Sequence, residues 1–467
     1  MNSVLEHIAQ NSFLRFVDPN SHRVYSFNDL IQKKTPILSG LAFAYLDNSI
    51  DSVSWFFRLW NSPIIIALLP DSLAIELKET LEEVYTPNCI VDFRRSEIRG
   101  YFEDSNCFLK QQGIDKSLSK SANKLNNNSK IKLLLSTSGT TGSPKFVKLS
   151  EENVVQNTLS VCEYLPIIKD DIIPLNLPIY YSFGLSVLLS NCFRGGKILC
   201  SNDDIVQRNF WENANRYQIT SMAGVPTSFE LLSKLKFFKK PTSSLRYMIQ
   251  AGGKLNENLV EEVAKSSVEF SFSFFVMYGA TEATARMSFL DPSKVIRKFN
   301  SIGQPISGGL FKIDEENNEL LYKGPNVFGG YATGRNDLQT FDNIEWLRTG
   351  DLAIQDEEGD YIIVGRIKRI VKIFGKRINL DELEQLINKT LKTNVCIESY
   401  SDKIIGLFLK LEDNTESLIP NILDFLQKQL FLHKSVIKTI LVNEIPLLGN
   451  GKVNYQKLKE ILNNEIG

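Results

Sequence analysis

One short stretch of the chain concentrates hydroxyl and glycine residues in a pattern that fits phosphate binding. It runs Ser136-Thr-Ser-Gly-Thr-Thr-Gly-Ser-Pro-Lys145 and follows the apolar segment 131–135. Glycines let the backbone approach an anion closely, hydroxyls and backbone N–H groups donate hydrogen bonds to phosphate oxygens, and Lys145 adds a mobile positive charge. The spacing differs from that of a Walker A loop. We therefore expect a phosphate-binding loop at the end of a strand.

The rest of the composition disfavours other chemistries. The chain has only three histidines, none in a glycine-rich or acidic motif, which argues against a histidine-based triad or a histidine-bound metal. Its six cysteines form no CxxC pair and fit reduced thiols in a core. A net charge of −1 gives no basic excess for nucleic acid. Phosphate chemistry remains the leading interpretation.

The loop resembles the phosphate-binding signature of the acyl-adenylate-forming superfamily, which includes acyl-CoA synthetases, luciferases and peptide-synthetase adenylation domains. Further motifs follow in the family's order from the polar stretch 118–130 to the C-terminus, whereas the first hundred residues resemble the family loosely. The resemblance implies that Lys145 is catalytic and that the loop binds ATP through Thr137, Ser138, Gly139, Thr140, Thr141 and Gly142.

Two further motifs complete the expected nucleotide site. In Tyr278-Gly-Ala-Thr-Glu282 the resemblance implies that Tyr278 stacks on adenine beside Gly279, that Thr281 contacts phosphate, and that Glu282 ligates Mg²⁺. Many relatives carry Asn or Gln two residues before this tyrosine, but here Val276 stands there. In Trp346-Leu-Arg-Thr-Gly-Asp351 the aspartate is expected to accept hydrogen bonds from the ribose hydroxyls. The backbone of Ala251, Gly252 and Gly253 is expected to border the adenine.

The C-terminal part carries motifs that resemble the family's hinge and its catalytic lysine. The stretch Gly365-Arg-Ile-Lys-Arg-Ile-Val-Lys-Ile-Phe-Gly375 implies that Arg366 helps to hold the nucleotide, that Lys368 is the pivot, and that Gly375 forms the turn used in thiol transfer. Arg369 and Lys372 also fit a charged strand at the surface. Lys452, in Gly449-Asn-Gly-Lys452, is expected to reach the carboxylate and the α-phosphate.

The acyl pocket shows substitutions that bear on the substrate. Tyr181 stands where many acyl-CoA ligases have histidine, and Ser182 stands where amino-acid-activating relatives place an aspartate. An ammonium group buried without a counter-charge is costly, which argues against an amino-acid substrate. Arg286 either faces a polar acyl group or forms a structural ion pair, and the two interpretations stay open. The expected pocket residues are Tyr181, Ser182, Gly184, Thr227, Ala280 and Arg286.

These motifs predict an ATP- and Mg²⁺-dependent acid–thiol ligase that forms an acyl-AMP from a small carboxylic acid and transfers the acyl group to a thiol. The acceptor is either coenzyme A or the phosphopantetheine of an acyl or peptidyl carrier protein. One alternative is a stand-alone amino-acid adenylation protein that loads a carrier. Another is a non-catalytic nucleotide-binding relative, which the presence of Lys145, Glu282, Asp351 and Lys452 disfavours.

The elements that must position these residues alternate between strand and helix. Residues 209–217 and 257–265 read as helices, each followed by an apolar strand-like run, 219–225 and 272–278. This alternation predicts an α/β fold with a large N-terminal domain of mixed sheets flanked by helices and a small mobile α+β C-terminal domain. We expect residues 1–366 to form the adenylation domain, 367–369 the hinge, and 370–467 the domain that carries the catalytic lysine.

The sequence also predicts where in the cell the protein is found. The longest apolar run, Pro63 to Pro70, is far shorter than the roughly 20 residues that a membrane span needs, and it reads as a buried strand. The N-terminus lacks a basic region followed by an apolar stretch, which argues against a signal peptide. We therefore expect a cytoplasmic protein.

Overall fold

The structure is a computed structural model. It describes residues 3–32, 39–95, 97–100, 127–136, 145–373, 376–391, 393–400, 404–411, 415–430, 434–448 and 451–466. Backbone contacts divide the chain into two compact units. The first comprises Met1–Leu310 and Tyr322–Leu347, and the second comprises Phe311–Leu321 and Arg348–Gly467. The predicted division at residues 367–369 remains a prediction.

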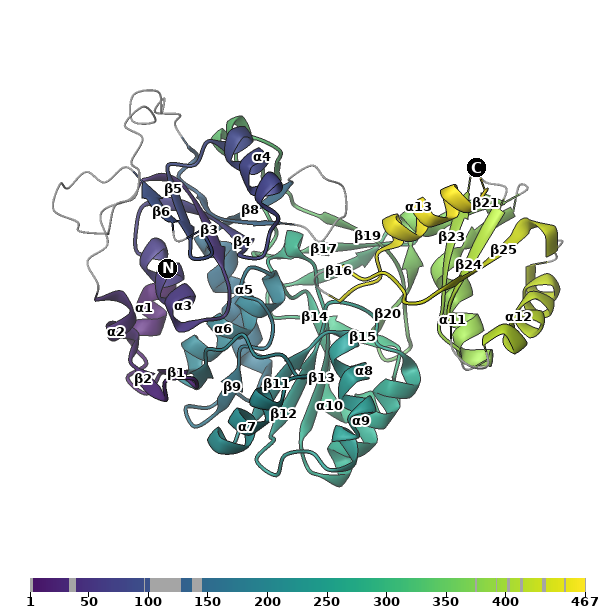
Figure 1. Cartoon of the computed structure of the whole chain (residues 1–467), viewed down its shortest axis with the longest axis horizontal. Helices are drawn as coiled ribbons and strands as arrows, with labels where there is room; N and C mark the ends of the chain where they lie inside the picture. The colour runs from purple at the N-terminus through teal and green to yellow at the C-terminus, as the bar shows by residue number, and fades with distance from the viewer. Residues whose placement is uncertain are drawn as a thin grey trace. The chain divides into compact units, whose positions relative to one another are not determined.

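A seven-stranded mixed sheet carries the base of the expected phosphate loop (Figure 1). Its order is β18-β8-β7-β4-β3-β5-β6, and β3, β4, β5 and β7 run parallel. The carboxyl ends of these four strands therefore meet at one edge, where ligands collect in α/β folds. The strands are β3 (Gly40–Leu46), β4 (Ile64–Pro70), β5 (Cys89–Asp92), β6 (Glu97–Gly100), β7 (Ile131–Ser136), β8 (Phe146–Ser150) and β18 (Tyr331–Ala332).

Both faces of this sheet are buried because helices cover them. Helix α4 (Ile75–Tyr85) packs Leu81 and Tyr85 into the same apolar cluster as Phe43 and Phe146. Helices α3 (Ile50–Trp60) and α5 (Glu151–Tyr164) also contact its strands. Such central strands read as near-continuous apolar runs, as Ile64–Pro70 does, and the predicted buried strand is confirmed.

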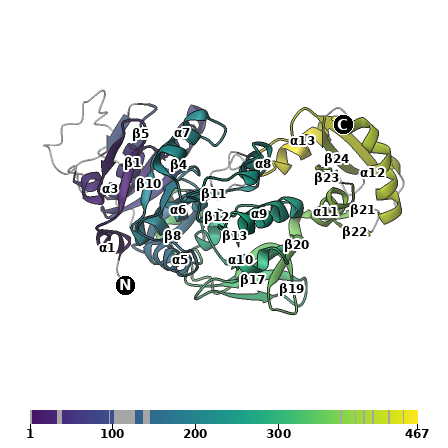
Figure 2. The ribbon, with the colours of Figure 1, turned by 90° about the horizontal axis from the view of Figure 1, so that it is seen from below.

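A second group of strands carries the Tyr278 motif. Strands β11 (Ser221–Gly224), β12 (Tyr247–Gln250) and β13 (Ser273–Tyr278) run parallel, and β14 (Ser288–Leu290) and β15 (Ser301–Pro305) continue antiparallel. Helices α7 (Arg208–Tyr217), α8 (Pro226–Lys234) and α9 (Glu257–Glu269) contribute to one apolar cluster with β11, β12 and β13, and Figure 2 shows α9 alongside these strands. The predicted helices and strands of this region are confirmed.

A small sheet near the N-terminus completes the first unit. Its order is β2-β1-β10-β9, with β1 (Arg15–Asp18), β2 (Arg23–Tyr25), β9 (Ile172–Pro174) and β10 (Lys197–Leu199). The remaining helices of the unit are α1 (Val4–Ala9), α2 (Phe27–Ile31), α6 (Ser182–Arg194) and α10 (Pro292–Val295).

The second unit has strands and helices of its own. Strand β19 (Leu347–Gln355) pairs with β20 (Tyr361–Arg366), and β21 (Ile370–Ile373) pairs with β22 (Lys376–Asn379). A sheet of β23 (Val395–Tyr400), β24 (Ile404–Lys410) and β25 (Ile437–Val442) shares an apolar cluster with helices α11 (Leu380–Leu391) and α12 (Thr415–Leu430). Helix α13 (Tyr455–Ile466) packs Leu458 and Leu462 into a further cluster. The predicted α/β class, with mixed sheets in the large part and an α+β C-terminal part, is confirmed.

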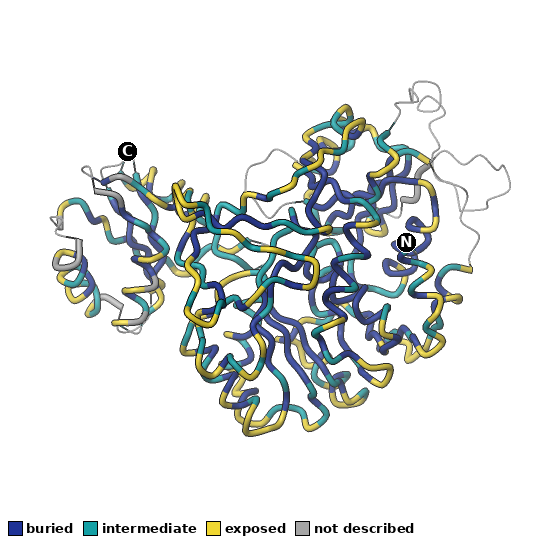
Figure 3. The backbone as a smooth tube through the Cα atoms, turned by 180° about the vertical axis from the view of Figure 1, so that it is seen from behind, coloured by how far each residue is buried: buried dark blue, intermediate teal, exposed yellow. Residues whose placement is uncertain are grey.

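Within each unit, many of the buried residues lie on the strands, as Figure 3 shows. Cys89, Cys162, Cys192, Cys200 and Cys396 are all buried and free, which confirms them as core thiols, while Cys107 lies outside the described residues. Burial raises the pKa of Cys89 and of Cys162 to about 12, so neither is a ready nucleophile. Among the helices that the structure describes, none is long and apolar enough to cross a membrane.

Candidate active site

The expected phosphate loop joins two neighbouring antiparallel strands. Ser136, the last residue of β7, pairs with Phe146, the first residue of β8. Loop residues Thr137 to Gly142, predicted to bind ATP, lie outside the described residues, whereas Lys145 at the loop's far end is described. Lys145 Nζ lies 3.3 Å from the centroid of the Tyr331 ring. The loop's basic residue is therefore held over an aromatic face.

Tyr331 also contacts the carboxylate that is expected to bind metal. Its hydroxyl donates a hydrogen bond of 2.8 Å to Glu282 Oε1. Burial and the neighbouring Glu282 raise the pKa of the Tyr331 phenol, so the hydroxyl stays protonated and keeps donating. One tyrosine thus contacts both Lys145 and Glu282, which are far apart in the sequence. Tyr331, which ends the stretch Gly329-Gly-Tyr331, is not among the residues that the sequence analysis predicts for the site.

The Tyr278 motif begins where β13 ends, as predicted. Gly279 is required there, because a Cβ atom would lie 1.8 Å from the carbonyl oxygen of Ala285. Thr281 opens a short 3-10 turn, and its Oγ1 lies 3.3 Å from Ser182 Oγ. The predicted phosphate and acyl residues Thr281 and Ser182 are therefore in contact. Val276, two residues before Tyr278, is a buried core residue of the strand.

The backbone just after Glu282 is strained. Thr284 has φ 65° and ψ −59°, and the amide of Ala285 donates to the carbonyl of Ala283 at 2.7 Å. These are the features of a γ-turn with positive φ at its centre, which is rare and costs free energy. Thr284 Oγ1 donates to the carbonyl of Asn326, and this contact helps to hold the turn. Neither Thr284 nor Asn326 was identified from the sequence as positioning this segment.

Helix α5 supplies most of the support for that turn. Ser150 and Asn153 form a capping box that starts the helix. Asn153 Nδ2 then donates to the carbonyls of Pro325 and Val327. One turn later, Asn157 Nδ2 donates to the carbonyl of Arg286. Ser160 Oγ donates to the carbonyl of Ser307. Tyr164 stacks on Phe289 with ring centroids 4.0 Å apart. Residues 153, 157, 160 and 164 follow helical spacing, so one face of α5 binds the backbone around the motif.

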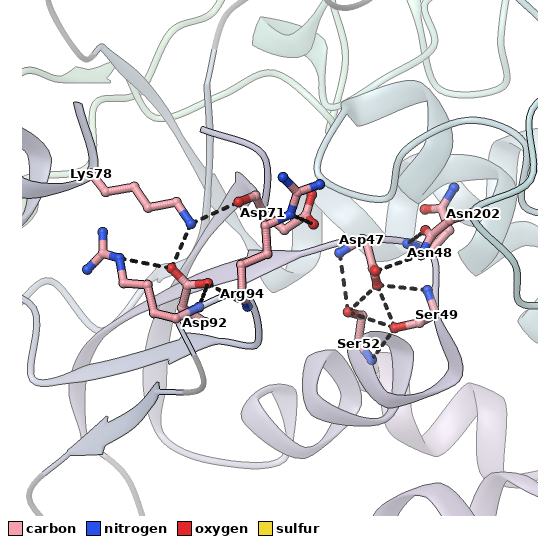
Figure 4. A network of polar contacts seen from close by, with 10 residues as sticks. Asp47, Asn48, Ser49, Ser52, Asp71, Lys78, Asp92, Arg94 and Asn202 are labelled. Carbon is pink, nitrogen blue, oxygen red and sulfur yellow. Dashed lines mark hydrogen bonds and ion pairs between the residues drawn. The ribbon is translucent and has the colours of Figure 1, made fainter. Parts of the chain in front are cut away.

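The acyl motif Pro178–Gly184 is held by the turn that follows β3. Asn48 Nδ2 donates to the carbonyls of Leu175 and Leu177, and Asn48 Oδ1 accepts from the amide of Ile179. Figure 4 shows Asn48 beside Asp47, Ser49, Ser52 and Asn202, which form hydrogen bonds with one another.

Figure 4 also shows the buried pair Lys78–Asp92 (2.6 Å) beside Asp71 and Arg94, at the carboxyl ends of β4 and β5. This polar edge was not predicted.

The residues of the first unit that are predicted to line the acyl pocket or to border the adenine lie just after strands or in the first turns of helices. Tyr181 caps helix α6, and Gly184 is required because a Cβ atom there would lie 2.1 Å from the carbonyl oxygen of Pro178. Gly252, with φ 85°, follows β12 beside Ala251 and Gly253. Thr227 lies in the first turn of α8, and Ala280 lies directly before the 3-10 turn.

Arg286 follows the γ-turn and is buried, with 2% of its surface exposed. Its guanidinium lies 3.9 Å from the centroid of the Phe183 ring and hydrogen-bonds to Tyr164. None of the ion pairs formed by the described residues involves Arg286. The interpretation of Arg286 as one half of a structural ion pair is therefore wrong for the part of the chain that the structure describes.

In the second unit, Asp351, which is predicted to bind the ribose, faces Arg366, which is predicted to help hold the nucleotide, across a strand pair. Asp351 on β19 is opposite Arg366 on β20, and Arg366 Nε lies 3.0 Å from Asp351 Oδ1. Thr349 Oγ1 donates to the carbonyl of Leu320, and the amide of Gly350 donates to Glu319 Oε1, which fixes the approach to Asp351. Asn318 has φ 60°, a region that asparagine tolerates.

The residues around the predicted hinge are not all at the surface. Lys368 lies in a 3-10 turn, Ile367–Arg369. Arg369 is only 8% exposed, so its interpretation as a surface charge is wrong. Its guanidinium contacts Asp381, lies 2.6 Å from Glu384 and stacks 3.7 Å from the Tyr455 ring centroid. Arg369 can be buried because carboxylates on α11 compensate its charge. The sequence pattern of the strand around Arg369 does not reveal these partners. The side chain of Lys372 lies outside the described residues.

Lys452 belongs to a tight turn near the C-terminus. The amide of Leu448 donates to the carbonyl of Lys452 at 2.7 Å, and Gly451 has φ 78°. Three residues later, Tyr455 starts α13 and donates to Glu384 Oε2 at 2.8 Å. The turn that carries Lys452 is thereby connected to the Arg369 cluster. Gly375, the predicted thiol-step turn, lies outside the described residues.

Glu282 is the carboxylate that is predicted to ligate Mg²⁺. Within the described residues, no group of three or more His, Cys, Asp or Glu side chains could hold a metal by itself. Mg²⁺ is commonly bound by one or two carboxylates together with substrate phosphates and waters, and not by an all-protein cage. A single carboxylate at Glu282, near the phosphate loop's Lys145, fits that mode.

The profile of the family described as AMP-binding enzyme matches residues 64–332, which is more than half of the chain. The match begins nearer the N-terminus than the motifs indicated, and it ends before Asp351, Arg366 and Lys452.

Relatives of low identity extend over most of the chain. The chain is 26% identical to 2-succinylbenzoate–CoA ligase of Staphylococcus epidermidis over 98% of both chains. It is also 26% identical to oxalate–CoA ligase of Saccharomyces cerevisiae over 71% of this chain, and that match spans 63% of the yeast protein.

Solved structures share the fold. o-Succinylbenzoate CoA synthetase of Bacillus subtilis, in complex with the acyl-adenylate OSB-AMP, has a TM-score of 0.75 at 21% identity, with 98% of each chain covered. McyG A-PCP in complex with phenylalanyl-adenylate has a TM-score of 0.72 at 17% identity, covering 100% of this chain and 83% of McyG A-PCP. With the family profile matching residues 64–332, the chain belongs to the AMP-binding enzyme family.

Proposed function

We propose that this protein is an AMP-forming acid–CoA ligase, which activates a carboxylic acid with ATP and transfers the acyl group to coenzyme A. The observation that carries the proposal is the meeting of Lys145 and Glu282 at Tyr331, next to the contact between Thr281 and Ser182. A cation, a carboxylate and hydroxyls in one place suit the charge that develops during phosphoryl transfer.

In the first step, the substrate carboxylate attacks the α-phosphorus of ATP, and pyrophosphate leaves. Lys145 and the loop before it bind the phosphates, and Thr281 donates a hydrogen bond to them. Glu282 would hold the magnesium ion. The bound metal would offset negative charge on the phosphate oxygens. Asp351 accepts hydrogen bonds from the ribose hydroxyls, Arg366 helps to hold the nucleotide, and Lys452 neutralises the carboxylate and the α-phosphate.

In the second step, a thiolate attacks the carbonyl carbon of the acyl-AMP, and AMP leaves. This step needs no general base from the protein if the thiol arrives deprotonated. We assign Lys368 to the pivot of a domain rotation and Gly375 to the turn that then replaces Lys452. Such a rotation about a short hinge is a common way to alternate two half-reactions.

Coenzyme A is the favoured acceptor, and a carrier protein is the second candidate. The relatives that match over nearly their full length are named as CoA ligases. McyG A-PCP keeps the carrier-protein alternative open, because its adenylation fold is also shared. Two relatives are named for acids with two carboxyl groups, oxalate and 2-succinylbenzoate.

Lys452→Ala separates the two proposed steps. The variant should lose ATP–pyrophosphate exchange by about 100-fold or more, because one donor to a developing anion contributes roughly that factor. It should still convert supplied acyl-AMP to the thioester. Mass-spectrometric detection of acyl-AMP across a library of acids, with and without coenzyme A, identifies substrate and acceptor. An unchanged exchange rate in the variant would contradict the role assigned to Lys452.

A further inference from the structure

A full positive charge lies inside the first unit, and no carboxylate among the unit's described residues balances it. Arg286 is 2% exposed, and burial lowers the pKa of its guanidinium to about 10, so the group remains charged near neutral pH. The side chain's contacts are with Tyr164 and with the face of Phe183. Within the described residues, its Nε has no hydrogen-bond partner.

Neutral neighbours offset only part of the cost of this burial. An aromatic face and a phenol stabilise a guanidinium through its charge distribution, but they do not neutralise it. Charged side chains in protein interiors are normally paired, since an uncompensated buried charge is strongly unfavourable. An anion that binds here would therefore gain both a strong charge-assisted contact and a partner for the free Nε–H.

The position of Arg286 connects it to the acyl pocket rather than to an unrelated core. The carbonyl of Arg286 accepts hydrogen bonds from Asn157 (2.8 Å) and Asn326 (2.9 Å), so the residue is held rigidly. Its stacking partner Phe183 stands between Ser182, which contacts Thr281, and Gly184. Phe183 Cδ1 lies 3.9 Å from where a Cβ atom on Gly252 would be. Three segments that carry predicted site residues, 181–184, 251–253 and 280–286, thus meet around the Phe183–Arg286 pair.

We propose that Arg286 binds a second anionic group of the acyl substrate, so that the acid activated here carries a carboxylate in addition to the one that is adenylated. The proposal rests on the proposed function. A guanidinium has a planar fork of donors that matches a carboxylate in a bidentate contact. A diacid would satisfy this fork, whereas a neutral analogue would leave the buried charge unpaired.

The experiment compares each diacid with its own monoamide, which has nearly the same shape and one charge less. Pairs such as succinate and succinamate, glutarate and glutaramate, and phthalate and phthalamate are assayed by pyrophosphate release with ATP and Mg²⁺, together with oxalate and 2-succinylbenzoate. The wild type, Arg286→Met and Arg286→Lys are tested. Arg208→Met is the matched control, because Arg208 is 91% exposed and pairs only with Glu212 on its own helix.

We expect the wild type to prefer the best diacid over its monoamide by about 100-fold or more in kcat/KM, since a site built for a hydrogen-bonding group strongly rejects an analogue that lacks it. Arg286→Met should remove most of this preference by lowering the rate on the diacid alone. Arg286→Lys should keep part of it, and Arg208→Met all of it. A wild type that treats both members of every pair alike would overturn the proposal, as would an equal loss on both members in Arg286→Met.

A binding measurement separates this inference from the proposed function. The diacids and monoamides are also tested without ATP for their effect on the thermal unfolding midpoint. Diacids should stabilise the wild type and Arg208→Met but not Arg286→Met. If no acid releases pyrophosphate, the proposed function fails, and the unfolding midpoints still decide the anion site. If Arg286→Met does not fold, the anion site is tested by Arg286→Lys and by the preference of the wild type for each diacid over its monoamide. Equal midpoints with diacids and monoamides in the wild type would refute anion binding at Arg286.

Discussion

Tyr331 presents two different surfaces to two charged groups of opposite sign. Its ring face supports Lys145 at 3.3 Å, while its hydroxyl donates to Glu282 at 2.8 Å. Its neighbour Ala332 pairs with Phe146, the residue after Lys145, so strand pairing brings β18 to the end of the phosphate loop. Glu282 is held from a second direction as well, because its carbonyl accepts from the amide of Phe328. We infer that Tyr331 is a positioning residue that keeps the carboxylate and the lysine in place before ATP arrives.

Tyr331→Phe and Tyr331→Leu test these two contacts separately. Loss of a hydrogen bond to a carboxylate costs about 1–2 kcal/mol. The phenylalanine variant should therefore need several-fold more Mg²⁺ for half-maximal pyrophosphate exchange, because Glu282 is less well oriented, while its KM for ATP changes little. The leucine variant also loses the ring and should raise the KM for ATP. An unaltered Mg²⁺ dependence in Tyr331→Phe would show that the hydroxyl does not position Glu282.

At the scale of elements, helix α5 and the segment 325–327 act together on one strained turn. The helix contributes Asn153 and Asn157, and the segment contributes Asn326, whose Nδ2 donates to the carbonyls of Ala283 and Arg286 at 2.8 and 2.9 Å. Asn326 Oδ1 accepts from the Tyr322 hydroxyl. These buried amides supply the free energy that keeps Thr284 at positive φ, and the turn in turn sets the positions of Glu282 and Arg286.

Asn326→Asp is nearly isosteric and should break this arrangement. It replaces a donor with an acceptor opposite two carbonyl oxygens and buries a charge, because Asn326 is 1% exposed. The cost should be about 3 kcal/mol or more, seen as a clear fall in the thermal unfolding midpoint and in pyrophosphate exchange. Asn300→Asp makes the same chemical change at an exposed position and should have little effect. Equal midpoints for the two variants would mean that the amide does not hold the turn.

The sequence predicted the strands that carry the motifs more readily than the supports around them. Apolar runs such as 272–278 and glycines such as Gly279 carry local signals, and the structure has β13 and a forced glycine there. Tyr331, Asn326 and Arg369 act through partners distant in the chain, and a single residue type carries no information about such partners. One signal was available: the polar residues Asn153, Asn157 and Ser160 repeat at helical spacing, on a helix that buries them together with Val154, Val155 and Val161.

At the scale of the whole molecule, the residues named in the proposed function are divided between the two units. Lys145 and Glu282 belong to the first, whereas Asp351, Arg366 and Lys452 belong to the second. Within the second unit, Arg369, Glu384 and Tyr455 connect the residue after the predicted pivot to the helix that follows the Lys452 turn. We therefore expect this cluster to keep the Lys452 turn in a fixed relation to the pivot, and its ionisation to affect the stability of the second unit.

The pH dependence of that stability follows from Glu384. Burial raises the pKa of the Glu384 carboxyl to about 7, although Arg369 partly offsets the effect. The folded unit therefore binds this proton more tightly than the unfolded chain, whose value is near 4.5. Stability from this group is complete below pH 4.5 and is lost as the pH rises through 7. Glu384→Gln should remove most of this dependence.

Cysteine positions allow the second unit to be followed by itself in the intact chain. Cys396 is buried on β23 and belongs to the second unit, whereas the other five cysteines and all four tryptophans belong to the first. Unfolding of the second unit in a urea series is followed by the labelling of Cys396 with 4,4′-dithiodipyridine. The labelling is quantified by peptide mass spectrometry between pH 5 and 8. Tryptophan fluorescence follows the unfolding of the first unit. The labelling midpoint should fall as the pH rises in the wild type and in the exposed control Glu382→Gln, but much less in Glu384→Gln. The same slope in all three proteins would exclude Glu384 as the titrating group.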